Sequence, residues 1–206
     1  MRKLAILGAS GHGKVVADTA ECCGWQVVEF FDDACSERQA NGAWRVTGDT
    51  AALLTQLDRF DGVVVAIGNN RIRLVKMLEL QAADARLVTL VHPAATVSRY
   101  ASVGAGSVVF AGAVVNADAR IGFGAILNTG CSVDHDCVLG EAVHVSPGAS
   151  LAGGVQVGNL SWIGIGASVR QLVRIGSGVV VGAAAAVVAD VADGLTVVGV
   201  PARAVA

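Results

Sequence analysis

The second half of the chain carries a repeat with a period of six residues. From Val97 to Val187 every sixth residue is Val, Ile or Leu, without interruption. A period of six does not suit an α-helix, and it is too regular for ordinary hairpins. It is typical of short strands joined by tight corners, with the aliphatic residue pointing into a narrow core and Gly at the bends. The sequence therefore predicts a hexapeptide β-solenoid.

The fifth position of each hexad is as regular as the first. From Ala101 to Val191 it holds only Ala, Val, Ser or Cys. Cys131 and Cys137 both occupy this small position. We interpret them as core packing and not as a pair of metal ligands, because a free Cys behaves as a small apolar residue. No metal site is predicted.

The first part of the chain alternates strand-like and helix-like segments. Strands are expected at 3–7, 25–31 and 61–67, helix-like runs at 49–57 and before Cys23 and Ala83, and a polar loop after Asp33. This alternation predicts a small parallel sheet. Residues 1–90 are thus expected to form a Rossmann-like α/β half-domain. Residues 91–206 are expected to form the all-β solenoid with a C-terminal tail.

Glycines and acidic residues follow the expected strands of the α/β domain. Gly8-Ala9-Ser10-Gly11-His12-Gly13 comes after the first strand and Asp32-Asp33 after the second. In a parallel sheet these segments meet beyond the carboxyl ends of the strands, where ligands bind. The glycine spacing differs from the dinucleotide pattern, so two interpretations stay open: a tight turn without a ligand, or a turn that approaches a pyrophosphate. A half-sized sheet suits a mononucleotide better than NAD.

One histidine of the repeat lies among acidic residues. His135 is flanked by Asp134 and Asp136, at a position in the hexad that should face outward near a corner. Charged residues are scarce in the repeat, so this cluster is unusual. A carboxylate beside an imidazole orients the ring and raises its basicity, as a general base near neutral pH requires. A solvated surface histidine is the alternative.

Composition excludes several classes of protein. The chain of 206 residues is 53% hydrophobic and 16% charged, with a net charge of −2. This charge offers no attraction for nucleic acid or an anionic membrane. Residues 142–169 lack charges, yet polar residues are spread along them, so no membrane span is predicted. Five cysteines without CxxC spacing and the absence of a signal-like segment favour the cytoplasm.

Together these motifs resemble the PglD/NeuD group of bacterial sugar acyltransferases in the hexapeptide-repeat family. They follow one another in the family's order along nearly the whole chain: 8–13, Asp32-Asp33, 66–70, 127–129, 133–137, His144-Val145-Ser146 and 199–202. The sequence is most similar to the UDP-4-amino-sugar N-acetyltransferases. The resemblance implies a left-handed parallel β-helix with three hexads per coil. It also implies a homotrimer that binds acetyl-CoA between subunits and a UDP-amino sugar on the N-terminal domain.

The resemblance also implies roles for individual residues. His135 would be the general base that takes a proton from the sugar amine, and Asp136 would increase its basicity. Acetyl-CoA would be bound by His144, Ile165 and Ala183. The nucleotide sugar would be bound by Ser10, Gly11, His12, Asp32, Asp33 and Asn69. The thioester is already activated, so no metal is required. His135 and His144 are half a coil apart, so we expect them to share a site only between subunits.

The predicted function is acetyl-CoA-dependent N-acetylation of a nucleotide-linked amino sugar for surface glycan synthesis. The expected substrate is a UDP-4-amino-4,6-dideoxy sugar. One alternative is O-acetylation of sialic acid or another sugar by the same fold. Another is a trimeric nucleotide-sugar-binding protein without catalysis. A zinc carbonic anhydrase built on the same solenoid would need three His ligands. Only His135 and His144 lie in the repeat, so the sequence disfavours this class of enzyme.

Overall fold

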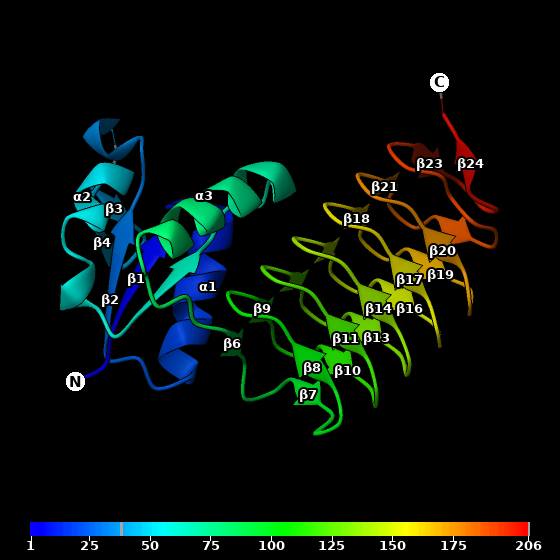
Figure 1. Cartoon of the computed structure of the whole chain (residues 1–206), viewed down its shortest axis with the longest axis horizontal. Helices are drawn as coiled ribbons and strands as arrows, with labels where there is room; N and C mark the ends of the chain where they lie inside the picture. The colour runs from blue at the N-terminus through cyan, green and yellow to red at the C-terminus, as the bar shows by residue number, and fades with distance from the viewer. Residues whose placement is uncertain (38, 206) are drawn as a thin grey trace. The chain divides into compact units, whose positions relative to one another are not determined.

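The computed structural model describes residues 1–37 and 39–205 of the chain. Contacts divide it into two compact units, Met1–His92 and Pro93–Ala206 (Figure 1). The division falls two residues after the boundary expected from the sequence. Within the described residues, no helix has both the length and the apolar character needed to cross a membrane.

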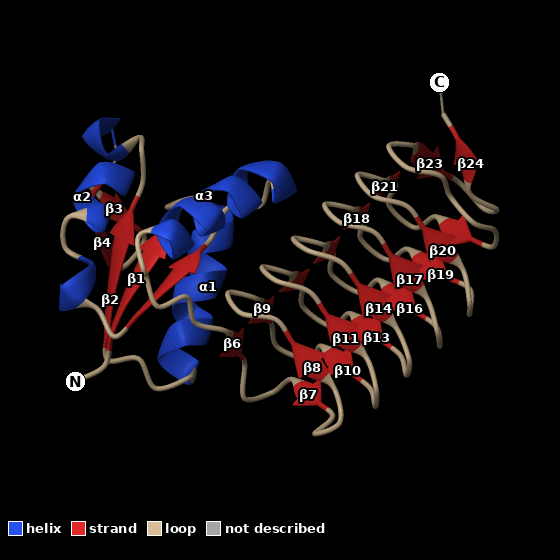
Figure 2. Cartoon of the chain, in the orientation of Figure 1, coloured by secondary structure: helices blue, strands red, loops and turns tan. Residues whose placement is uncertain are grey.

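The first unit contains a β-sheet and helices (Figure 2). In the part of this unit that the structure describes, the sheet has five strands and there are three α-helices. Its strand order is β3-β4-β2-β1-β5, and every pair in it is parallel except the β3–β4 hairpin. The strands are β1 (Lys3–Leu7), β2 (Val27–Phe31), β3 (Ala40–Asn41), β4 (Trp44–Gly48) and β5 (Gly62–Val65), with β6 (Leu90–Val91) near the end of the unit. The helices are α1 (Gly11–Cys22), α2 (Thr50–Leu54) and α3 (Asn70–Ala82), with short 3-10 turns at Cys35–Glu37 and Leu57–Arg59. The sheet is therefore the predicted Rossmann-like half-domain with an added edge.

That added edge corrects one expectation. A polar loop was predicted after Asp33, but β3 and β4 form a hairpin there, and β4 runs parallel to β2. Trp44 of β4 lies edge-on to Phe30 of β2, with ring centroids 6.2 Å apart, and its Nε1 donates to Glu21 at 2.7 Å. These partners are distant in sequence, so the segment acquires its strand character from tertiary contacts.

Helix α1 begins very close to the end of β1. A Cβ atom on Gly13 would lie 2.5 Å from the carbonyl oxygen of Gly8, which is closer than a Cβ atom can approach without a shift of the backbone. Gly8 itself has φ +112, a conformation that favours glycine. The glycine spacing after β1 therefore serves this close strand-to-helix turn, which places Ser10 at the N-cap of α1.

The second unit is the predicted left-handed parallel β-helix. Each strand pairs with the strand 18 residues further along, as Val114 pairs with Ser132 and Ser132 with Ser150. Eighteen residues are three hexads, so each coil contributes one strand to each of three sheets, whose stacked strands are visible in Figure 1.

Strands of two residues make up nearly all of these sheets. The first contains β7 (Thr96–Val97), β10 (Val114–Val115), β13 (Ser132–Val133), β16 (Ser150–Leu151), β19 (Ser168–Val169) and β22 (Ala186–Val187). The second contains β8 (Ser102–Val103), β11 (Arg120–Ile121), β14 (Val138–Leu139), β17 (Gln156–Val157) and β20 (Arg174–Ile175). The third contains β9 (Val108–Val109), β12 (Ile126–Leu127), β15 (His144–Val145), β18 (Trp162–Ile163), β21 (Val180–Val181), β23 (Thr196–Val198) and β24 (Arg203–Ala204).

The core of the β-helix consists of the first and fifth residues of the hexads. Cys131 and Cys137 are buried in it, as their position in the repeat predicts, and burial raises the pKa of the Cys131 thiol to about 12. Ser161 is also fully buried, but its hydroxyl donates to the carbonyl of Gly176 at 2.7 Å and accepts from the amide of Val179 at 3.0 Å. The core is thus closed by small residues whose polar atoms are paired.

Candidate functional site

His135 stands at the corner between β13 and β14. The residue after it, Asp136, has φ +60, a left-handed conformation that Asp tolerates better than most residues. At this corner the Asp136 carboxylate reaches the preceding side chain, with 2.7 Å between its Oδ2 and Nδ1 of His135. The His135 side chain remains 61% exposed. The corner therefore presents an oriented imidazole at the surface of the β-helix.

The second acidic neighbour of His135 is held by the previous coil. Asp134 accepts a hydrogen bond from Nδ2 of Asn116 at 2.9 Å and another from the backbone amide of His135 at 2.8 Å. These bonds fix a second negative charge beside the imidazole without neutralising it.

The two carboxylates change the protonation of His135. The hydrogen bond that His135 donates to Asp136 raises the pKa of His135 above its ordinary value, and the charge of Asp134 adds to the effect. When Nδ1 donates to Asp136, Nε2 carries the lone pair and can accept a proton. The His135–Asp136 pair can thus act chemically as a base whose second nitrogen is held by a carboxylate.

His144 lies elsewhere on the coil, in strand β15 of a different sheet. It is almost fully buried, its ring is 4.2 Å from that of Trp162 between centroids, and its Nε2 is 3.2 Å from Nδ2 of Asn128. A mainly apolar groove of about 530 Å³ runs past it, and Ile165 and Ala183 line the same groove. The three residues expected to bind acetyl-CoA therefore share one groove, which does not include His135.

A cavity of about 280 Å³ lies at the carboxyl ends of the strands in the first unit. Ser10, Asp32 and Asp33 line it, together with backbone of the turns after β1 and β5. Asp32 accepts hydrogen bonds from the amides of Ala9 at 2.6 Å and Ala34 at 2.9 Å, so its carboxylate ties two of the lining turns together. The polar residues predicted after β1 and β2 thus meet at one edge of the sheet.

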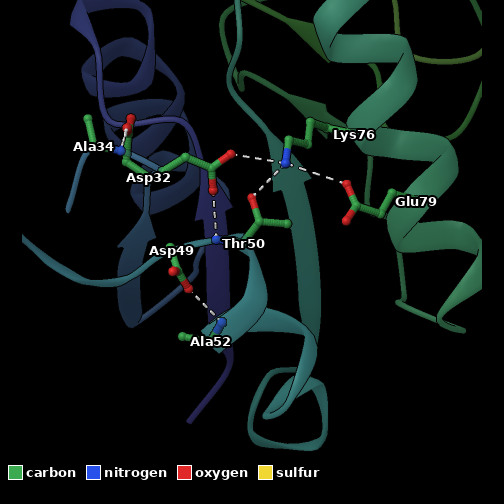
Figure 3. Close-up of polar contacts among 8 residues, drawn as sticks. Asp32, Ala34, Asp49, Thr50, Ala52, Lys76 and Glu79 are labelled. Atoms are coloured by element: carbon green, nitrogen blue, oxygen red, sulfur yellow. Dashed lines mark hydrogen bonds and ion pairs between the residues drawn. The ribbon is translucent and has the colours of Figure 1, made fainter. Parts of the chain in front are cut away.

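Lys76 of α3 also lines this cavity, and the sequence analysis did not single it out. Its Nζ is 3.0 Å from Oδ2 of Asp33, 3.5 Å from Glu79 and 3.0 Å from the hydroxyl of Thr50 (Figure 3). Hydrogen bonds from Thr50, with the Lys76 charge, lower the pKa of Asp33 to about 2. The cavity therefore holds an ionised carboxylate and a cation side by side.

Three of the residues expected to contact the nucleotide sugar do not line this cavity. Gly11 begins α1, and Asn69 caps α3 by accepting a hydrogen bond from the amide of Ile72 at 3.0 Å. His12 lies inside the fold, where burial and the nearby Arg73 cation lower its pKa to about 4. His12 is therefore a neutral imidazole near pH 7. His12 and Asn69 lie where they can support the turns after β1 and β5.

Two features of this β-helix are typical of the hexapeptide-repeat acyltransferase class. One is an imidazole that is hydrogen-bonded to a carboxylate at a corner, and the other is an apolar groove along one sheet. Residues 3–79 match the family model described as the PglD N-terminal domain. The acetyltransferase domain of PglB from Neisseria gonorrhoeae, solved with acetyl coenzyme A, is 45% identical over 99% of both chains, with a TM-score of 0.95. The chain belongs to this family of PglD-type sugar acyltransferases.

Two further relatives carry informative names. Perosamine N-acetyltransferase from Caulobacter crescentus, solved as a histidine-to-asparagine variant with CoA and GDP-perosamine, is 39% identical, with a TM-score of 0.96 over 100% of this chain and 98% of that one. UDP-N-acetylbacillosamine N-acetyltransferase of Bacillus subtilis is 37% identical over 117 residues. That match spans 54% of this chain and about half, 52%, of the curated relative.

Proposed function

We propose that the protein transfers the acetyl group of acetyl-CoA to the amino group of a nucleotide-linked 4-amino sugar, in the cytoplasm, for surface glycan synthesis. The observation that carries the proposal is the His135–Asp136 pair, with Nδ1 held 2.7 Å from Oδ2 of Asp136 and the His135 side chain 61% exposed. Family members of similar sequence are named N-acetyltransferases of a UDP-linked and a GDP-linked amino sugar. We take the UDP-linked 4-amino-4,6-dideoxy sugar as the substrate.

In this reaction His135 would accept the proton that the sugar amine loses as its nitrogen attacks the thioester carbonyl. Asp136 would stabilise the imidazolium that forms, because its carboxylate accepts the hydrogen bond from Nδ1. The C–S bond of the thioester would break as the C–N bond forms, and the proton held on His135 would pass to the departing CoA thiolate. The products would be an amide and free CoA thiol, with His135 neutral again. None of these steps calls for a covalent intermediate on the protein.

The groove beside His144 suits acetyl-CoA. Its apolar lining can take the pantetheine arm, while His144 and Asn128 offer polar atoms at its edge. The cavity of the first unit suits the nucleotide, since Lys76 and the glycine turns can approach a diphosphate. Ser10, Asp32 and Asp33 would contact the nucleotide there, whereas Gly11, His12 and Asn69 would shape the turns around it.

The groove and His135 belong to different parts of the coil, so one subunit would not place the base beside the thioester. We therefore propose a homotrimer in which His135 of one subunit serves the groove of the next. A symmetric oligomer repeats such a heterologous contact three times around the ring.

The direct test follows free CoA thiol when the purified protein meets acetyl-CoA and a UDP-4-amino-4,6-dideoxy sugar. His135→Ala should lower turnover by roughly 10²–10⁴-fold, the usual contribution of general-base catalysis. A GDP-linked 4-amino sugar is the second arm, and the mass and amide linkage of the product distinguish N- from O-acetylation. Equal rates of the two proteins would remove His135 from the mechanism.

A further inference from the structure

Gly153 differs from the other glycines of the β-helix. Glycines such as Gly130 have positive φ, and others such as Gly122 lie against the backbone of the next coil. Gly153 has neither constraint: its φ is ordinary, and the three atoms nearest to where its Cβ would lie all belong to one side chain. That side chain is His135.

The contact is close. A Cβ atom on residue 153 would lie 2.6 Å from both Cε1 and Nε2 of the His135 ring and 3.3 Å from Cδ2. A Cβ atom does not approach another heavy atom to 2.6 Å without something moving, so the imidazole occupies the space that any other side chain at this position would fill. The edge of the ring that lies over Gly153 includes Nε2, the nitrogen left to accept a proton.

The backbone of this corner does not itself require glycine. Counting back from residue 153, the same corner position carries His135 one coil earlier and Ala117 two coils earlier, and Gln171 follows one coil later. Side chains are therefore accommodated at this position in three other coils of the same geometry. What is particular to residue 153 is the imidazole beneath it.

Resting on the proposed function, we propose that Gly153 is a positioning residue for the general base: its missing side chain leaves the seat in which the His135 imidazole keeps its contact with Asp136. Two supports then fix the ring. Asp136 holds Nδ1 from the side, and the bare backbone of Gly153 allows the opposite edge to lie across the next coil. Among the described residues, Asp134 also acts on the ring through its charge, and Asn116 of the preceding coil holds it.

Gly153→Ala tests this seat with the smallest possible change. Its Cβ meets only the end of a rotatable side chain, so the ring should turn away while the β-helix keeps its fold. We expect a loss of roughly 10²-fold in kcat, the scale associated with a misplacement of about 1 Å. The thermal unfolding midpoint should change little, and Gln171→Ala, at the same corner position one coil later, should leave the rate unchanged.

A double-mutant cycle isolates the imidazole. In the His135→Ala background the seat is empty, so adding Gly153→Ala should change the residual rate by less than about twofold. This double variant also removes the clash, so it is expected to fold even if the single variant proves unstable. A full additional loss in that background would overturn the proposal, because Gly153 would then act on something other than His135.

NMR titration of the imidazole gives a readout that does not depend on turnover. In Gly153→Ala the pKa of His135 should fall toward the ordinary histidine value of about 6.5, because the bond to Asp136 is disturbed. An unchanged pKa together with an unchanged rate would refute the seat. If the pKa falls in Gly153→Ala but His135→Ala keeps full turnover, the seat stands and the proposed catalytic role of His135 fails.

Discussion

At the residue scale, the proposed mechanism depends on the protonation of a single exposed imidazole. His135 must be neutral to accept a proton, and the hydrogen bond that its ring donates to Asp136 raises the pKa of the ring. A raised pKa means that the base becomes protonated, and activity is lost, as the pH falls through a value higher than the ordinary pKa of histidine. The same pair therefore makes a stronger base and moves its working range upward.

The rising limb of kcat/KM against pH should consequently have its midpoint above about 6.5, the ordinary pKa of histidine. Asp136→Asn removes the largest cause of the shift, so the midpoint should move to lower pH while the rate at the plateau falls. Asp134→Asn should move it less, because Asp134 acts on the ring only through its charge. The measurement is the pH profile of all three proteins with acetyl-CoA in excess. A limb that none of the substitutions moves would show that another group titrates.

Lys76 sits among three oxygen-bearing partners at the cavity of the first unit. Lys76→Met should raise the KM for the nucleotide sugar by about tenfold or more, since a hydrogen bond to a charged group contributes about 1.5–3 kcal/mol. The kcat should change little, because Lys76 is not near the reacting amine in the proposed mechanism. Arg71→Met, an exposed cation on the same helix, is the matched control. An equal rise in KM for both variants would indicate a general effect of charge.

These residues show what sequence can predict of a site. The phase of the hexads fixes which residues fall at corners, so the exposed position of His135 beside Asp136 follows from counting along the repeat. Lys76 has no such signal: it reads as an ordinary cation on the polar side of a helix. Its role depends on where α3 packs relative to Asp33 and Thr50, and only the folded sheet determines that. The same holds for Gly153, because its contact with His135 forms only when the coils stack.

At the element scale, the β-helix was predictable because each hexad repeats the same local demand. One aliphatic residue points inward and one small residue closes the coil, and both are buried in nearly all coils, with partial burial in the first one. Strand β4 is the opposite case. Its five residues contain a Trp, an Arg and a Gly, and their strand character comes from Phe30 of β2, which no local pattern indicates.

The alternation within each short strand leads to a stability prediction. In β14, Leu139 points into the core and is almost fully buried, whereas its neighbour Val138 points outward. Leu139→Ala should lower the free energy of unfolding by about 2–5 kcal/mol, because it leaves a cavity in a close-packed core. Val138→Ala should change it by less than about 0.5 kcal/mol. Thermal or denaturant unfolding of the two variants measures the contrast, and similar losses would mean that the hexad phase assigned to β14 is wrong.

At the scale of the whole molecule, the groove and the base lie on different parts of the coil. His144 is in the sheet that contains β15, and His135 is at the corner after β13. The proposed trimer brings them together by placing the corner of one subunit against the groove of its neighbour. Every active site would then take its base and its acetyl-CoA contacts from different chains.

Mixed trimers test this arrangement. His135→Ala and His144→Ala trimers should each have low activity when acetyl-CoA is subsaturating, since each lacks one part of every site. When the two chains are unfolded together and refolded in equal amounts, about one quarter of the sites should receive both histidines, because each site draws its two halves independently from neighbouring subunits of a cyclic trimer. Activity should therefore rise to about one quarter of that of the native protein treated in the same way. If both histidines of a site came from one chain, no mixed site would be complete, and activity would stay at the average of the two variants.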